Sequence, residues 1–312
     1  MIWQNQEKKY HTYNRYLRNK YGQKVFKVSL NGHFTCPNKD GSKGLGGCIF
    51  CSPSGSGDFA GSVKDDLQTQ FDSVKTMMHE KWPNAKYIAY FQANTNTYKP
   101  TEALKEMFEA SIALDPDIVG LNIGTRCDAL EASKIDLLAD LNKKTDVTIE
   151  LGLQSIHEAT SEWMNRGHDL ACFESAVKAL RKQKLEVVVH IINGFPNETE
   201  SMMLETVEYL NRLDIQGIKI HMLHVMKNTA LAKQYHEKPF NLLTKEAYVS
   251  IAVKQIERLN PNIIVHRLTG DSPKDLLIAP LWTLKKFVVL NDIDKKMRRQ
   301  NTYQGKLYQQ TD

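Results

Sequence analysis

The sequence has few cysteines and no long apolar run. Five cysteines in 312 residues are an odd and low number, which argues against a disulfide framework and suits a reducing compartment. The longest apolar stretches, such as residues 185–192 and 287–290, fall well short of the roughly 20 residues that a membrane span needs. Residues 1–10 also lack the apolar core of a secretion signal. We therefore expect a cytoplasmic protein that does not cross a membrane.

The net charge of +5 is small, but it is unevenly spread along a chain whose 41% hydrophobic content excludes general disorder. Residues 1–30 hold seven Lys/Arg against one Glu, and residues 281–312 hold seven against three Asp. Trp282, Tyr303 and Tyr308 accompany the second basic segment, and cations mixed with aromatics can bind phosphates and stack an unpaired base. The two basic ends suit a polyanionic partner such as RNA, or they are solvated surfaces without a partner.

Short β-type runs alternate with longer amphipathic segments through most of the chain. The pattern predicts strands at 24–30, 86–91, 118–123, 147–151, 185–191 and 217–221, and helices at 65–81, 101–114, 130–143, 172–183 and 198–213. This alternation is typical of βαβ units, and hence of a parallel sheet with helices outside it. Periodicity leaves open whether the sheet closes partly into a barrel or lies flat as a doubly wound sheet.

In either fold, ligands bind where the parallel strands end. Most of the unusual residues lie directly after predicted strands, at 31–51, 92–98, 124–128, 154–155, 193–196 and 224–229. After residue 243 the pattern changes to a helix at 244–259, a short strand at 263–268 and a basic helical tail. We therefore expect one domain at 1–243 and an extension at 244–312 that packs on it and faces the substrate.

Three of the cysteines, Cys36, Cys48 and Cys51, lie within sixteen residues in a Cx11CxxC pattern. A structural zinc site normally has four Cys or His ligands, whereas three thiolates on an iron–sulfur cube leave one iron open. The glycines between the cysteines allow the loop to wrap around a bulky inorganic group. A zinc site with His33 or another histidine as fourth ligand remains an alternative.

With this spacing the chain resembles the radical SAM enzymes, and among them the YtqA/YhcC group, which is related to the catalytic subunit of Elongator. Beyond the cysteines, the matching stretches are 90–98, 124–128, 150–155, 165–168, 190–196, 219–224 and 267–271. The resemblance covers nearly the whole chain and implies an α/β fold, a partial (β/α)6 TIM-like barrel with a small C-terminal extension. Cys127 stands where the Elongator motif has proline, and we expect no acetyltransferase activity from a chain of this length.

The resemblance implies that Cys36, Cys48 and Cys51 bind a [4Fe-4S] cluster whose open iron is chelated by S-adenosyl-L-methionine. Reduction by a low-potential donor such as flavodoxin or ferredoxin would then release a 5'-deoxyadenosyl radical that abstracts hydrogen from carbon. By match to the family, we expect contacts with S-adenosylmethionine from Gln92, Asn94, Glu150, Gln154, Arg166, Asn193 and Gly194.

Substrate contacts are expected from Arg126, Asp128, His190, His221 and Arg267. The spacing of His221 and His224 is compatible with a metal site, but strand residues three apart face opposite sides of a sheet. At most one of the two should therefore point into the barrel, and we expect His190 and His221 to line the substrate cavity. Cys127 and Cys172 are expected to be structural, the first as a small buried residue.

The resemblance further implies a tRNA substrate. MnmL-type enzymes of this group convert the 5-carboxymethylaminomethyl group of (2-thio)uridine at wobble position 34 to 5-aminomethyl. Hydrogen abstraction from the glycyl methylene, oxidation to an imine and hydrolysis would release the free amine, with one S-adenosylmethionine consumed per turnover. The alternatives are a radical SAM enzyme acting on a small metabolite and a noncatalytic, zinc-stabilised RNA-binding protein.

Overall fold

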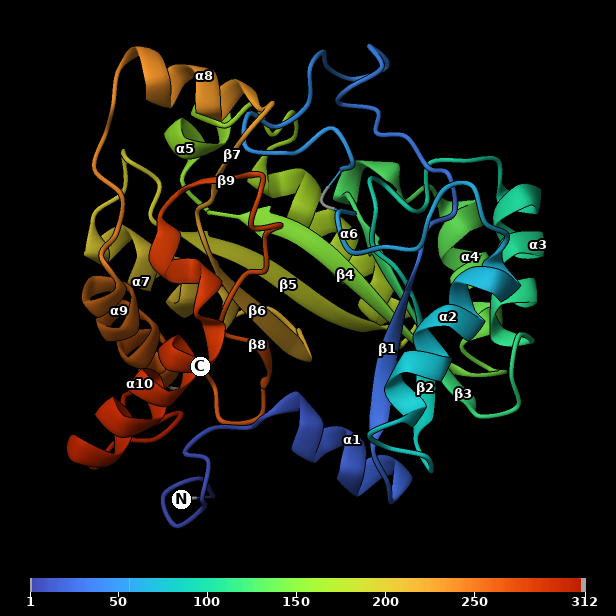
Figure 1. Cartoon of the computed structure of the whole chain (residues 1–312), viewed down its shortest axis with the longest axis horizontal. Coiled ribbons are helices and arrows are strands. Elements are labelled where there is room, and N and C mark those ends of the chain that lie inside the picture. The colour runs from blue at the N-terminus through green and yellow to red at the C-terminus, as the bar shows by residue number, and fades with distance from the viewer. Residues whose placement is uncertain (1, 56, 310–312) are drawn as a thin grey trace.

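A curled sheet of parallel strands forms the centre of the computed structural model, which describes residues 2–55 and 57–309. Within this part of the chain the sheet has seven strands, and each is hydrogen-bonded to the next in sequence order. They are β1 (Val25–Leu30), β2 (Lys86–Phe91), β3 (Ile118–Thr125), β4 (Asp146–Gln154), β5 (Glu186–Asn193), β6 (Gly217–Met222) and β8 (Ile264–Arg267). Because the sheet curls without closing, β1 and β8 form the two edges of a half-barrel (Figure 1).

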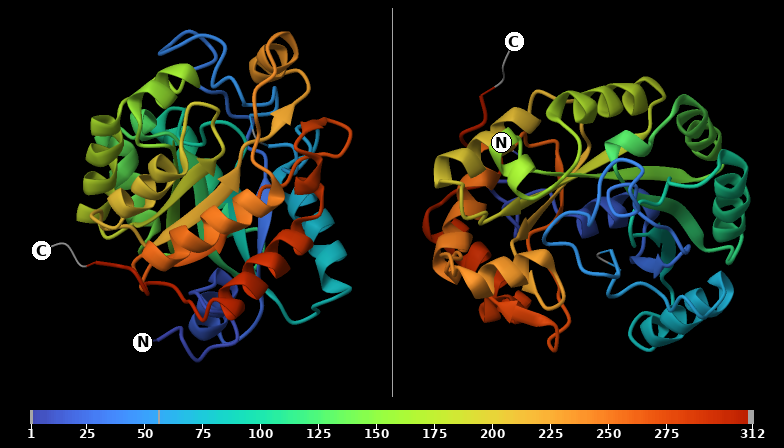
Figure 2. Two further views of the ribbon diagram at one scale, coloured as in Figure 1. Left: turned by 90° about the vertical axis from the view of Figure 1, so that its left-hand side faces the viewer. Right: turned by 90° about the horizontal axis from the view of Figure 1, so that it is seen from above.

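Helices cover the outer, convex face of this sheet (Figure 2). Those that connect successive strands are α2 (Leu67–His79), α3 (Thr101–Ile112), α4 (Ala132–Leu141), α6 (Leu170–Lys182), α7 (Glu200–Leu210) and α9 (Lys245–Arg258). Each crosses from one parallel strand to the next, as the sequence predicted. Shorter helices are α5 (Glu158–Trp163), α8 (Ala230–Glu237) and the 3-10 turns η1 (Cys127–Ala129) and η2 (Leu281–Leu284), and α10 (Lys286–Arg299) packs beside α9.

Threonine and aspartate side chains fix where several of these helices begin. The Asp66 carboxylate accepts the backbone N–H of Thr69 at the start of α2, and Asp169 accepts that of Cys172 at the start of α6. Thr199, Thr229 and Thr244 cap α7, α8 and α9 in the same way. These oxygens satisfy N–H groups that have no partner within the helix, so local sequence sets the helix starts.

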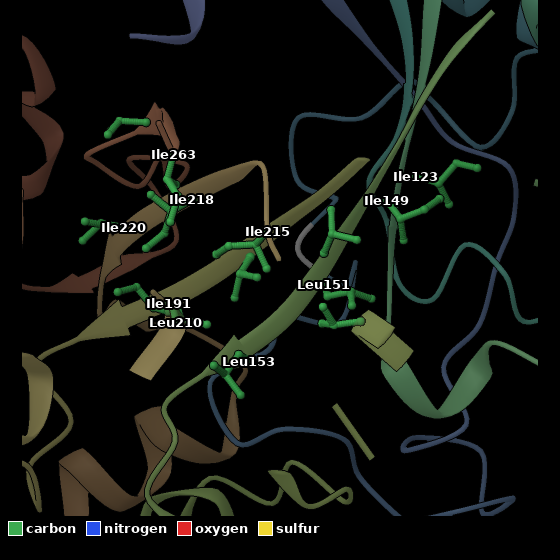
Figure 3. Close-up of a cluster of buried hydrophobic side chains, with 14 of the residues drawn as sticks. Ile123, Ile149, Leu151, Leu153, Ile191, Leu210, Ile215, Ile218, Ile220 and Ile263 are labelled. Atoms are coloured by element: carbon green, nitrogen blue, oxygen red, sulfur yellow. The ribbon is translucent and has the colours of Figure 1, made fainter. Parts of the chain in front are cut away.

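The hydrophobic core lies between the convex face of the sheet and the helices. Ile149, Leu151 and Leu153 alternate along β4 and are completely buried, beside Ile191 of β5 and Ile218 of β6 (Figure 3). Because successive strand residues point to opposite faces, the residues between them face the concave side. The helices therefore leave that side of the sheet free for polar groups.

The N-terminal segment, for which the sequence analysis proposed no helix, contains α1 (Tyr13–Tyr21). This helix begins at Thr12, ends at Gly22 and packs against both edge strands, β1 and β8. The two basic ends of the chain meet there, because Lys8 pairs with Asp294 of α10 and Gln304 accepts the His11 N–H. Segments that are far apart in sequence thus form one basic side of the molecule.

The structure confirms the predicted fold class and adds detail that periodicity did not provide. The short strand after residue 243 is β8, which pairs with β6 as the last strand of the sheet. A separate antiparallel pair, β7 (Val225–Met226) with β9 (Leu277–Ala279), lies above the sheet. Within residues 2–55 and 57–309 no helix has the length and apolar character to span a membrane.

Candidate active site

The cysteine loop follows β1 and lies over the carboxyl ends of the strands, where Cys36, Cys48 and Cys51 line one cavity of about 170 Å³. Tight turns shape the loop at both ends: Cys36 O accepts the N–H of Lys39, and Cys48 O accepts that of Cys51. In the described residues no three His, Cys, Asp or Glu side chains are grouped as ligands of a single metal ion. The cysteines instead surround a shared space.

Two backbone hydrogen bonds hold the CxxC turn against distant segments. Ile49 N donates to Met164 O over 3.0 Å, and Leu231 N donates to Ile49 O over 2.8 Å. Ile49 also belongs to a small apolar cluster with Met164, Phe195 and Leu231. The chain between the second and third cysteines is therefore fixed by the loop after β4 and by α8.

Asn38 organises the glycine-rich part of the loop. Its side chain is completely buried, and its Nδ2 donates to Asn165 O at 2.6 Å and lies 3.8 Å from Cys48 Sγ. A Cβ at Gly44 or Gly167 would stand 2.2 or 2.5 Å from Asn38 Oδ1. These glycines are required because the backbone closes on this amide. The amide in turn directs an N–H toward one of the three sulfurs.

The donor set fits an iron–sulfur cluster. Burial first, and then the charge of the neighbouring Cys51, raises the pKa of Cys48 to about 12. Thiols brought together in this way ionise readily only when a cationic group binds them. Three thiolates are the ligands that a cubane cluster with one open iron uses.

Most of the residues expected to contact S-adenosylmethionine line the cysteine cavity, and two do not. Gln92, Asn94, Glu150, Gln154 and Arg166 are all in its wall. Neither Asn193 nor Gly194 lines this cavity, and the buried amide of Asn193 exchanges hydrogen bonds of 2.8 and 2.9 Å with Gln255 of α9.

Asn94 and Gln154 both adopt a φ of 62°, a left-handed conformation that is uncommon outside glycine. They lie just after β2 and at the end of β4, so each turns the chain at the rim of the half-barrel. Gln154 Oε1 is buried, and no group in residues 2–55 and 57–309 donates a hydrogen bond to it. Strained backbone and an unsatisfied buried acceptor are both typical of binding sites.

Arg166 holds the end of β4 in place. Its side chain is 1% exposed, and its guanidinium donates to the carbonyl oxygens of Leu153, Ser155 and His168 at 2.7 to 3.0 Å. One nitrogen, Nη2, has no hydrogen-bond partner among the described residues and lies 4.0 Å from the Glu158 carboxylate. Arg166 therefore combines a structural role with one donor that remains available beside the cavity.

The expected substrate residues are distributed between two adjoining cavities. Arg126 and His190 line the cysteine cavity, and Asp128 holds Arg126 through two hydrogen bonds of 2.9 Å without lining that cavity itself. His190, His221 and Arg267 line a second cavity of about 330 Å³. The two cavities share five lining residues, namely Phe50, Tyr90, Gln92, Gln154 and His190.

The expectation that His221 and His224 face opposite ways is wrong, because both line the second cavity. Strand β6 ends at Met222, so His224 already lies in the following loop. The alternation of side chains applies only within the strand, and the loop turns His224 back toward the cavity.

Glu150 is the centre of a buried polar network on the concave face. Its carboxylate accepts hydrogen bonds from Lys27, Tyr90, Asn122, His190 and Lys219, which come from five other strands. Burial opposes its ionisation, but the ammonium groups of Lys219 and Lys27 hold the pKa of Glu150 well below the usual value. Burial, followed by the charge of Lys219, lowers the pKa of His190 to about 4, so this histidine is neutral at pH 7.

The sequence analysis did not single out Lys27, Tyr90, Asn122 or Lys219. The signal was present, because each is a polar residue between apolar neighbours in a strand, as in Ile218-Lys219-Ile220. The structure also brings Cys127 and Cys172 together, with 3.4 Å between their sulfurs. These two cysteines are 45 positions apart, so no local signal indicated that contact.

Comparison with known proteins identifies the family. The model of the radical SAM superfamily matches residues 41–210, and that of the radical SAM C-terminal domain matches residues 215–299. The uncharacterized protein YtqA of Bacillus subtilis is 50% identical over 98% of this chain and 95% of its own length. Protein YhcC of Escherichia coli K12 is 35% identical, with 89% of each chain covered.

Among solved structures, the archaeal Elp3 of Methanocaldococcus infernus, without its N-terminal residues, has the same fold with a TM-score of 0.68. The likeness covers 90% of this chain and 64% of that one at 16% sequence identity. Members of the matched family bind a [4Fe-4S] cluster and S-adenosylmethionine, as expected from the cysteine pattern. The chain belongs to the radical SAM superfamily, within the group that contains YtqA and YhcC.

Proposed function

We propose that this radical SAM enzyme modifies tRNA, converting 5-carboxymethylaminomethyl-(2-thio)uridine at the wobble position to the 5-aminomethyl form. The observation that carries the radical chemistry is the shared cavity of Cys36, Cys48 and Cys51, bounded by Gln92 and Gln154 at the carboxyl ends of the strands. A second cavity adjoins it through shared walls. A substrate carbon in the second cavity would lie next to the cofactor in the first.

Within this proposal Cys36, Cys48 and Cys51 hold the cluster, and Gln92, Asn94, Gln154 and Arg166 contact S-adenosylmethionine. When bound, these two groups supply a 5'-deoxyadenosyl radical that abstracts a hydrogen atom from the substrate. The chain orients the two partners, since Phe50 and the other shared lining residues place the second cavity directly beside the cysteines.

The basic surface supports an RNA partner. The side of the molecule where the chain ends meet includes α1 with Arg15, Arg18 and Lys20, and α10 with its terminal Arg298 and Arg299. Trp282 and Tyr303, named above as stacking candidates, pack into the protein instead. Phe287 at the start of α10 is 71% exposed and lies next to Lys286, whose ammonium pairs with Asp271 at the second cavity.

The proposed function also requires an electron donor for the cluster and a cellular compartment that contains the tRNA. Reductive cleavage of S-adenosylmethionine needs a low-potential donor, and we propose a flavodoxin or ferredoxin in the cytoplasm, where tRNA is also available. The low number of cysteines agrees with that compartment.

The test is the formation of 5'-deoxyadenosine by anaerobically reconstituted protein with dithionite and S-adenosylmethionine. Three samples are compared: tRNA that carries carboxymethylaminomethyluridine, the same tRNA carrying unmodified uridine, and no tRNA. We expect the first alone to stimulate cleavage, with one 5'-deoxyadenosine per aminomethyluridine found by mass analysis of the digested nucleosides.

The other outcomes separate the alternatives. Equal cleavage in all three samples would retain the radical chemistry and favour a small metabolite as the substrate. Colourless protein that contains zinc, binds tRNA and cleaves no S-adenosylmethionine would favour the noncatalytic reading. Salt-sensitive binding of the tRNA is expected only if the basic surface contacts phosphates.

A further inference from the structure

The second cavity and the space between the edge strands are separated by a pair of cationic side chains. Lys219 and Arg267 line the second cavity and also a lateral cavity of about 520 Å³ between β1, β8 and α1. Lys219 extends from the middle of β6, where it is 7% exposed, and His190 is its register partner on β5. Lys219 therefore lies deep in the half-barrel, whereas the Arg267 side chain is 30% exposed.

The charges that face these cavities do not balance. Glu150 is one carboxylate between two ammonium groups, Lys27 and Lys219. Asp271 is paired with both Arg267 and Lys286, while Asp58 accepts hydrogen bonds from two serine hydroxyls. Lys24 faces the lateral cavity and donates to Asn14.

At neutral pH the four histidines near these cavities are uncharged, so they do not change this imbalance of charge. Burial lowers the pKa values of His190, His221, His224 and His266. When Lys219 is protonated, the network centred on Glu150 thus has one more cation than carboxylate. In a buried site such an excess favours the entry of an anion.

A second, independent observation is an unsatisfied donor or acceptor in the same cavity. His224 Nε2 is buried and has no hydrogen-bond partner in the part of the chain that the structure describes. Gly270 packs against its ring, because a Cβ there would stand 2.8 Å from His224 Cε1. The imidazole is therefore held in the wall with one nitrogen left for a ligand.

We infer that Lys219, together with His224 and Arg267, forms an anion subsite that binds a carboxylate of the substrate. Lys219 provides the charge, His224 provides a hydrogen bond, and Glu150 keeps Lys219 in position. On this inference Glu150 is a positioning residue, because its oxygens are already occupied by five protein donors.

A carboxylate at the end of a side chain fits this site better than a phosphodiester. One excess buried cation matches a monoanion, and a terminal group can reach a side chain at the depth of Lys219. A phosphodiester is also a monoanion, but a ribose on each side keeps it at the surface of a nucleic acid. The methionine carboxylate of S-adenosylmethionine is the other terminal candidate, but Lys219 does not line the cysteine cavity.

If the proposed function holds, the carboxylate is that of the carboxymethylaminomethyl group, and this identification rests on that function. The reacting methylene is bonded directly to the carboxylate. Binding the anion at Lys219 would therefore fix the methylene in the second cavity, next to the cysteine cavity. The product lacks the carboxylate and would lose this contact, which would favour its release.

The first test uses sodium acetate as the probe, at constant ionic strength, with the thermal midpoint of the reconstituted protein as the readout. We expect acetate to raise the thermal midpoint of the wild type. The Lys219→Met variant should need an acetate concentration at least about tenfold higher for the same shift. Lys24→Met is the matched control, a lysine of the lateral cavity outside the Glu150 network, and should behave as wild type. Glu150→Gln removes the carboxylate that holds Lys219 in place and favours its ammonium form, so it should also raise the acetate concentration required.

The second test compares the dissociation constants of tRNA bearing carboxymethylaminomethyluridine and tRNA bearing aminomethyluridine. Wild type should prefer the first by about tenfold, and Lys219→Met should bind both equally while its affinity for S-adenosylmethionine stays the same. A parallel loss of S-adenosylmethionine affinity would assign the subsite to the cofactor and overturn the inference.

The two tests distinguish failure of the inference from failure of the proposed function. If acetate protection depends on Lys219 but no tRNA is modified, the anion subsite is supported and the proposed tRNA substrate is wrong. If wild type modifies tRNA while Lys219→Met keeps both acetate protection and the preference between the tRNAs, the inference is wrong. Because Glu150→Gln and Lys219→Met should each raise the acetate requirement, misfolding of one variant would not leave the inference untested, and a wild-type response of both would overturn it.

Discussion

The two faces of the half-barrel are built from the same strands but have opposite character. On the convex face of β4, Ile149, Leu151 and Leu153 are completely buried among apolar neighbours. On its concave face Glu150 is equally buried, but it lies among ammonium, imidazole, phenol and amide groups. Alternation along a single strand thus separates stability from chemistry.

This difference indicates which contacts stabilise the fold and which serve binding and catalysis. Burying an apolar side chain stabilises the folded chain by about 1.5–3 kcal/mol. A buried ion pair gains little net stability, because the cost of removing its charges from water offsets their attraction. We infer that the concave network persists for recognition, and the variants below test that division from the largest expected effect to the smallest.

The largest effect is expected at the rim of the concave side. Cys48→Ala should remove a cluster ligand, so that iron content, visible colour and 5'-deoxyadenosine formation all fall below detection. Cys172→Ser is the control, because this cysteine lies on α6 against Cys127 and outside the cysteine cavity. Normal activity of Cys48→Ala with full iron content would contradict the assigned cluster site.

On the convex face the loss should be in stability instead. Leu151→Ala leaves a cavity in the core and should lower the free energy of unfolding by about 2–5 kcal/mol, measured by urea denaturation. The same change at Leu281, which is 63% exposed, should have little effect. Folded Leu151→Ala protein should cleave S-adenosylmethionine at the wild-type rate. Loss of cleavage in folded protein would contradict the assignment of stability to the convex face and chemistry to the concave face.

The pH dependence of the unfolding free energy should show how much the buried charge of Lys219 destabilises the folded protein. Burial, opposed by the charge of Glu150, lowers the pKa of Lys219 to about 7, below its value in the unfolded chain. Between these two pKa values the unfolded state binds more protons, so stability should rise as the pH increases from 7 to about 10. The gain is at most about 1.4 kcal/mol per pH unit and reaches its full extent only above the unfolded pKa.

Subtracting the curve of Lys219→Met from that of the wild type isolates this contribution from the other titrating groups. Lys233→Met changes a lysine side chain that is 79% exposed and is the control. If the wild-type and Lys219→Met stability curves run parallel between pH 7 and 10, Lys219 does not titrate there.

The smallest effect is expected at a helix end on the convex side. Thr199→Ala removes the side-chain oxygen that accepts the Met202 N–H at the start of α7, and should cost about 1 kcal/mol of unfolding free energy. Thr199→Ser keeps the acceptor and should restore most of that loss. Neither change should alter cleavage of S-adenosylmethionine, because α7 packs on the outside of the sheet.

Local pattern predicted much of the fold. Strand β2 has the predicted bounds, and β4 begins one residue before and ends three residues after its predicted bounds, at Asp146 and Gln154. The helices between strands agree to within a few residues, because apolar periodicity and polar caps are local properties. By contrast, α1 was missed although Thr12 and Gly22 cap it locally, and the place of β8 in the sheet was missed because it depends on pairing with β6, which is far away in sequence.

The candidate site was predictable to a similar degree. The spacing of Cys36, Cys48 and Cys51 predicted one site, and the three cysteines share one cavity. The orientation of Asn193 toward Gln255 could not be predicted, because the two residues are 62 positions apart. The same holds for the contact between Lys27 of β1 and Glu150 of β4, which requires the sheet to curl.

The sequence by itself determined the alternation of strands and helices, the cysteine spacing and the family, because each depends only on neighbouring residues or short motifs. Only the tertiary structure decided which polar side chains meet. The curl of the sheet brings Lys27 and Lys219, near opposite edges, onto the single carboxylate of Glu150. The excess charge that results is a property of the assembled half-barrel, since charge balance in a buried site depends on spatial neighbours and not on sequence order.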